Sequence, residues 1–153
     1  MLGTIWLIIS AMMFGGAMER SGLLKVITDR LIRIAQTPPA LVGATSFTCI
    51  FFNFTASDQY LSIVVPGRMF AKAYQDKGLA PENLSRTLED SGTVTSVLIP
   101  WNTCGAAQSG ALGISVLSFA PYCFFNILSP VMTLIFAVLA IKIKQLDPKA
   151  GDA

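Results

Sequence analysis

Apolar residues in this chain gather in long uncharged stretches. Residues 91–141 contain no Asp, Glu, Lys or Arg, and residues 2–18 form a shorter uncharged stretch. A membrane-spanning helix needs roughly 20 predominantly apolar residues, so the long stretch has room for two crossings and the short one lies at the lower limit for another. We therefore expect spans over residues 2–18, 91–117 and 119–141, with a polar tail over residues 142–153.

Residues 19–36 follow a different pattern, in which apolar residues recur at helical spacing. Lys25, Arg30 and Arg33 fall on the opposite face of the same predicted helix. A helix with one charged and one apolar face is typical of a segment lying in the membrane interface. We expect an interfacial helix here.

Residues 38–67 form a unit that is too long for one straight span and too short for two. The unit is uncharged until Asp58, becomes apolar again, and ends before Arg68. A re-entrant helical hairpin fits this length, with its tip near residues 53–58. A hairpin also leaves the basic segments on both sides of it, and the tail, on one side of the membrane. The positive-inside rule would make that side the cytoplasm.

The long uncharged run is interrupted by Pro100, Asn102, Thr103 and Gly105. Proline removes a backbone donor and glycine permits an unwound conformation, so a helix broken within the membrane is predicted, with a simple packing kink as the alternative. Broken helices at membrane depth are tolerated where they line a cavity or are buried in protein. The pattern predicts an all-α, polytopic integral membrane protein with about three spanning helices, one re-entrant hairpin and one discontinuous helix. It favours a transporter.

Composition agrees with this class, since 53% of the residues are hydrophobic and 13% are charged. Soluble proteins carry about 25% charged residues. The net charge of +2 comes without a basic stripe, which argues against nucleic-acid binding. No nucleophile–base pair or metal-ligand cluster is visible, so we expect neither an enzyme nor a cofactor. The chain has no histidine, so a transported proton must travel on a carboxylate or through water.

Asp58 is the strongest candidate for chemistry. An ionised carboxylate at the bilayer centre costs about 2.5–3.5 kcal/mol on insertion scales. Retaining Asp58 makes sense if it binds a cation, exchanges a proton or pairs with Arg68. Asn53, Thr55 and Ser57 add oxygen atoms at alternate positions beside it. The alternatives are an interfacial turn for Asp58 and hydroxyls that bond to their own helix.

Two further groups of polar residues accompany the predicted break. Asn102 and Thr103 form a second oxygen cluster within it. Glu89 and Asp90 are adjacent carboxylates just before the uncharged run, suited either to a proton entry point or to capping a helix start.

Four segments resemble the NhaC family of sodium/proton antiporters. They are residues 55–63 (TASDQYLSI), 66–70 (PGRMF), 84–93 (LSRTLEDSGT) and 98–105 (LIPWNTCG), within a resemblance that extends from about residue 14 to residue 136. One position departs from the family pattern, because Val97 stands where a proline commonly precedes Leu98.

The resemblance implies a multi-pass antiporter of the bacterial inner membrane, in contact with lipid, that exchanges sodium for protons. It implies an ion site between Asn53, Thr55, Ser57 and Asp58 on the hairpin tip and Asn102 and Thr103 at the break. It leaves membrane orientation open, because the same architecture can place the hairpin on the outer face.

The resemblance covers only the C-terminal repeat of a longer transporter. We therefore expect a fragment that needs a missing N-terminal repeat or a second copy of itself. Exchange of small organic anions such as malate and lactate, exchange of amino acids, and a fragment without transport are the alternatives.

Overall fold

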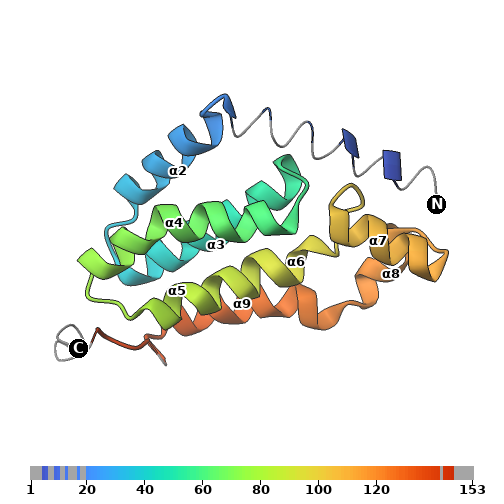
Figure 1. The fold of residues 1–153 in the computed structure, drawn as a ribbon. Coiled ribbons are helices and arrows are strands. Elements are labelled where there is room, and N and C mark those ends of the chain that lie inside the picture. Colours follow the sequence, from blue (N-terminus) through green and yellow to red (C-terminus); the bar gives the residue numbers. More distant parts are fainter. Residues whose placement is uncertain are drawn as a thin grey trace, which may run out of the picture.

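The computed structural model describes residues 5–6, 9–10, 13, 17, 20–141 and 143–146. Within these residues the protein is helical, with one isolated bridge between Leu79 and Gln145 (Figure 1). The predicted span over residues 2–18 lies largely outside the described residues, as does most of the tail. The elements are α2 (Leu23–Ile34), α3 (Pro38–Thr55), α4 (Gln59–Asp76), α5 (Pro81–Leu88), η1 (Glu89–Thr93), α6 (Val94–Ser96), α7 (Thr103–Leu112), α8 (Val116–Phe119), η2 (Ala120–Tyr122) and α9 (Phe124–Val138).

Helices α3 and α4 form a helical hairpin, side by side in Figure 1. Thr37 caps the first arm by accepting a hydrogen bond from the backbone N–H of Ala40, and the prolines that follow suit a helix start. Ser57 reverses the chain with a left-handed φ of 57°. The second arm runs to Asp76, beyond the predicted end at residue 67, because Pro66 and Arg68 are accommodated within the helix.

The broken helix is also present. Helix α5 begins at Pro81 and continues through the π-helix η1 and the short α6 before the backbone unwinds after Ser96. Helix α7 resumes at Thr103. The π-helix within the first half was not foreseen from the sequence.

Helix α9 packs against α3 of the hairpin and against η1 and α6 (Figure 1). By length and hydropathy, no single helix in the described part of the chain qualifies as a membrane span, whereas α8–η2 and α9 qualify as a pair bent by 56°. Phe125 and Val138 on α9 are each 71% exposed. An apolar surface of this kind is typical of contact with a membrane or another protein.

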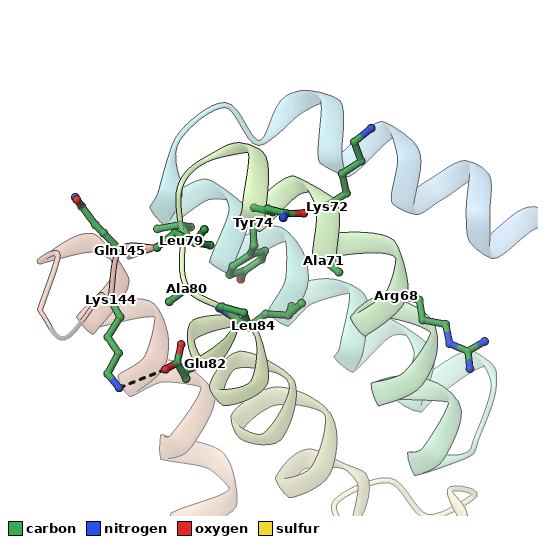
Figure 2. Close-up of a pocket in the computed structure, with 13 residues that line it drawn as sticks. Arg68, Ala71, Lys72, Tyr74, Leu79, Ala80, Glu82, Leu84, Lys144 and Gln145 are labelled. Carbon is green, nitrogen blue, oxygen red and sulfur yellow. Dashed lines mark ion pairs between the residues drawn. The ribbon is translucent and has the colours of Figure 1, made fainter. Parts of the chain in front are cut away.

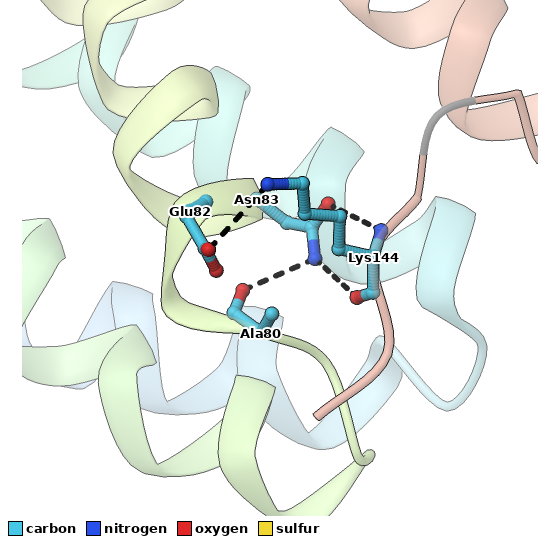
Figure 3. A network of polar contacts seen from close by, with 4 residues as sticks. All are labelled: Ala80, Glu82, Asn83 and Lys144. Atoms are coloured by element: carbon cyan, nitrogen blue, oxygen red, sulfur yellow. Dashed lines mark hydrogen bonds and ion pairs between the residues drawn. The ribbon is translucent and has the colours of Figure 1, made fainter. Parts of the chain in front are cut away.

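The hairpin and the broken helix meet along small and polar side chains. Asn53 of the hairpin and Thr95 of the broken helix are both buried and bond to each other at 3.1 Å. Small polar residues allow helices in membranes to approach closely. The opposite end of the bundle is fastened by Asn83, which exchanges hydrogen bonds with the backbone of Lys144 (Figure 3).

Candidate functional site

The hairpin tip presents a carboxylate at the start of α4. Asp58 has extended backbone and caps the helix, because its Oδ1 accepts a hydrogen bond of 3.1 Å from the N–H of Leu61. Its other oxygen, Oδ2, lies 3.5 Å from Thr103 Oγ1. The preceding carbonyl, of Ser57, accepts a hydrogen bond of 3.0 Å from the N–H of Thr103. The tip therefore contacts the broken helix through both backbone and side chain.

The break presents Asn102 at the start of α7. Its Oδ1 accepts a hydrogen bond from the N–H of Cys104, and its Nδ2 donates to Asn53 Oδ1 at 3.0 Å. Gly105 lies within α7, not in the unwound turn, so its predicted role is corrected. A methyl group there would collide with the carbonyl of Ile99, and glycine is required for this close approach.

Asn53 joins three segments of the chain. It is fully buried, and its Nδ2 donates to the carbonyl of Gly92 at 2.7 Å and to Thr95 Oγ1 at 3.1 Å. Its Oδ1 accepts from Asn102. One amide thus connects the hairpin, the first half of the broken helix and the start of its second half.

Four helix ends meet at this cluster of Asn53, Ser57, Asp58, Asn102 and Thr103, which we call the tip–break cluster. Helices α3 and α6 end there, and α4 and α7 begin there. Helix C-termini offer free carbonyl oxygens to cations, and helix N-termini favour negative charge. The arrangement suits a carboxylate working with a bound cation.

The hydroxyl of Thr55 bonds to its own helix rather than to the cluster. It donates a hydrogen bond of 2.8 Å to the carbonyl of Phe51, one turn earlier. This is the back-bonded alternative considered for these hydroxyls. Glu89 and Asp90 do not cap a helix start, because the helix begins at Pro81. Glu89 is exposed and accepts from Thr93, whereas Asp90 is half-buried and accepts from two hydroxyls of α9.

Two residues at the site were not singled out as ligands from the sequence. Gln59 Oε1 accepts from Ser96 Oγ at 3.4 Å and from the thiol of Cys104. Trp101 donates from Nε1 to the carbonyl of Phe54 at 2.9 Å, and their rings meet edge to face. The position of Gln59 directly after Asp58 is the one signal in the sequence that points to it.

Arg68 is placed away from Asp58. It is exposed on α4 and lines a cavity of about 1240 Å³ together with Lys72, Glu82 and Lys144 (Figure 2). Within the described residues the ion pair that forms is Lys144–Glu82, at 3.6 Å. Asp58 therefore has hydrogen-bond donors but no cationic partner in the described part of the chain.

The profile of the Na⁺/H⁺ antiporter family matches residues 1–141. This chain belongs to the Na⁺/H⁺ antiporter family. Membership of this antiporter family indicates a transporter rather than an enzyme. No solved structure matches it.

Three curated relatives with different named substrates are similar to this chain. The Na⁺/H⁺ antiporter NhaC of Alkalihalophilus pseudofirmus is 39% identical over 92% of the chain and 30% of the relative. The arginine/ornithine antiporter ArcD of Halobacterium salinarum is 37% identical over 96% of the chain and 31% of the relative. The malate-2H⁺/Na⁺-lactate antiporter of Bacillus subtilis is 27% identical over 89% of the chain and 29% of the relative. The chain thus spans about three-tenths of the length of these relatives.

Proposed function

We propose that this chain contributes an ion site for the exchange of sodium against protons across the bacterial inner membrane. The observation that carries the proposal is Asp58, whose Oδ2 lies 3.5 Å from Thr103 Oγ1 where four helix ends meet. The carboxylate has no ion-pair partner within the described residues. A cation or a proton would supply the missing positive charge.

In this proposal the hairpin α3–α4 re-enters the membrane and the broken helix crosses it. Helix α2 lies in the interface, and spans over residues 2–18 and 119–141 flank the unit. The apolar face of α9, with Phe125 and Val138, faces lipid or a neighbouring helix. The tip–break cluster then lies at membrane depth, where unwound backbone is tolerated because it lines an ion site.

Exchange follows from competition for one carboxylate. Sodium binds between Asp58 Oδ2 and Thr103 Oγ1, with Asn102 Oδ1, itself 3.5 Å from that hydroxyl, as a third oxygen. Asn53 holds Asn102 in place. A proton on Asp58 removes the negative charge that attracts the cation, so the two ligands exclude each other. Sodium therefore binds Asp58 only after the proton has left, and the proton binds only after sodium has left.

Transport by alternating access needs two repeats that move around a shared site. The chain supplies one hairpin and one broken helix, and it matches 30% of the length of the NhaC relative. We propose that the remaining repeat comes from further polypeptide or from a second copy of this chain.

A second candidate is the exchange of small organic anions or amino acids. The N-termini of α4 and α7 meet at the cluster, and helix N-termini attract carboxylate groups. Two relatives are named for arginine/ornithine and for malate and lactate. In this structure, however, Asp58 and Asn102 already occupy the two N-termini as caps. This observation favours a cation.

The test is sodium-induced proton movement in inverted vesicles from cells lacking their own antiporters, with the chain co-expressed with an NhaC N-terminal repeat. Asp58→Asn keeps the shape of the cap and removes the charge, so we expect exchange to be lost while membrane insertion persists. Asp76→Asn, at the exposed end of the same helix, is the matched control and should exchange normally. Normal sodium-dependent proton flux in Asp58→Asn would exclude Asp58 from the mechanism. Counterflow of malate or arginine without sodium dependence would favour the second candidate.

A further inference from the structure

Asp90 lies outside the tip–break cluster and has its own set of oxygen ligands. Its Oδ1 accepts a hydrogen bond of 3.0 Å from Ser129 Oγ, and its Oδ2 accepts one from Thr133 Oγ1. Both hydroxyls belong to α9, which also donates from Asn126 to the carbonyl of Val94 at 2.7 Å. The polar side of α9 is thus turned towards η1 and α6.

Asp90 accepts hydrogen bonds from these two hydroxyls, but no ion pair with it forms among the described residues. A cavity of about 530 Å³ opens beside it, walled by Phe125, Leu128, Met132 and Phe136. Arg86 lines the same cavity but makes no ion pair with Asp90, since the pair found among the described residues is Lys144–Glu82. An ionised carboxylate against apolar walls is costly unless a cation is near.

The π-helix that carries Asp90 also contains a buried hydroxyl without a hydrogen-bond partner among the described residues. Ser91 is fully buried, and its hydroxyl has no hydrogen-bond partner within the described residues. π-helical turns replace the regular hydrogen-bond ladder and are frequent at functional sites. The π-helix Glu89–Thr93 therefore contains one buried oxygen, Ser91 Oγ, that the described residues do not satisfy.

We propose that Asp90, Ser129 and Thr133 bind a sodium ion at a second site, separate from Asp58. Carboxylate and hydroxyl oxygens suit a hard cation, and the open cavity admits water to complete its shell. Binding replaces the hydrogen bonds from Ser129 and Thr133 to Asp90 with contacts from all three side chains to the ion. The site joins η1 to α9 through the cation.

This second site is coupled to the first through η1. The carbonyl of Gly92, two residues after Asp90, accepts the hydrogen bond from Asn53 that anchors the tip–break cluster. An ion that fixes the π-helix also fixes this carbonyl. Sodium at Asp90 therefore stabilises the arrangement in which Asp58 meets Thr103.

The experiment measures thermal unfolding of the full chain in lipid nanodiscs as sodium replaces N-methylglucamine at constant ionic strength and pH. The starting variant is Asp58→Asn, which removes the first site. We expect it to keep a sodium-dependent rise in melting temperature, and we expect Thr133→Val added to it to weaken the apparent sodium affinity at least 10-fold. Thr48→Val is the matched control, because Thr48 is equally buried but bonds only to its own helix through the carbonyl of Ala44.

Several outcomes would overturn the second site. The first is that Asp58→Asn alone abolishes the rise in melting temperature with sodium. The second is that Thr133→Val behaves like the Thr48→Val control. The third is that potassium raises the melting temperature as much as sodium does. If Thr133→Val does not fold, Ser129→Ala must weaken binding and Thr133→Ser, which keeps the hydroxyl, must retain it. Transport by Asp58→Asn is a separate readout, so failure of the first site and failure of the second are distinguishable.

Discussion

The side-chain amide of Asn102 donates a hydrogen bond of 3.0 Å to Asn53 Oδ1, joining the start of α7 to the buried end of α3. Both side chains are fully buried. The pair fixes the hairpin tip against the helix break, because Asn53 also donates to the carbonyl of Gly92. The geometry at Asp58 depends on this pair, although neither amide carries a charge.

Asn53→Ala is therefore expected to destabilise the protein strongly. The substitution removes the side-chain donor to the buried Gly92 carbonyl and leaves the Asn102 amide with the backbone carbonyl of residue 53 alone, at 3.2 Å. The loss of a partner by a buried polar group costs about 1–3 kcal/mol. We expect a loss of roughly 2–5 kcal/mol in unfolding free energy, measured by denaturant titration in detergent micelles. Gln108→Ala, at an exposed position of α7, is the control and should change stability little. Equal stability of the two variants would show that the amide pair does not hold the tip and the break together.

Much of this arrangement could be predicted from the sequence because the signals are local. Pro38, Asp58 and Pro81 mark helix starts through backbone chemistry that acts within a few residues. Pro100 likewise marks the break, and the carboxylate in an apolar stretch marks the site. These features need no knowledge of which helices pack together.

The features that escaped prediction depend on packing between distant segments. The partners of Asp90 are Ser129 and Thr133, far along the chain in α9, and only the packing of α9 on η1 brings them together. The role of Gly105 is similar, since it depends on the path of the Ile99 carbonyl rather than on the glycine backbone. Thr55 and Thr103 were equivalent candidates in the sequence, and the structure separates them by what each hydroxyl contacts.

Gly105→Ala should disrupt the break. The added methyl group would overlap the Ile99 carbonyl, which is backbone and cannot move aside without unwinding the turn further. We expect loss of transport and a lower melting temperature. Gly43→Ala is the matched control, because a methyl group at this helical glycine meets only Leu134 at an ordinary 3.7 Å, and alanine favours helix by about 0.5–1 kcal/mol. Comparable damage from the two substitutions would contradict the close approach at Gly105.

The thiol of Cys104 should report on sodium binding at Asp58. Cys104 is half-buried beside Gln59, two residues from Asn102, whereas Cys49 is fully buried. In a Cys49→Ser, Cys123→Ser background, we expect sodium to slow alkylation of Cys104 by at least about threefold, because an ion at the tip–break cluster holds the turn closed. Potassium is the control cation. Alkylation that is equally fast in both salts would argue against an ion beside this residue.

Thr103→Val and Thr55→Val provide the sharpest comparison between the two hydroxyls first considered as ligands. Thr103 Oγ1 faces Asp58, and its loss should raise the sodium concentration for half-maximal exchange about tenfold, equivalent to about 1.4 kcal/mol of binding free energy. Thr55 donates to its own helix at the Phe51 carbonyl, so valine there should change that concentration less than about twofold. The measurement is sodium-dependent proton flux at fixed pH, with both variants quantified in the membrane. If Thr55→Val impairs sodium affinity as much as Thr103→Val, the cation shell must extend into the end of α3, and the three-residue ligand set around Asp58 is wrong.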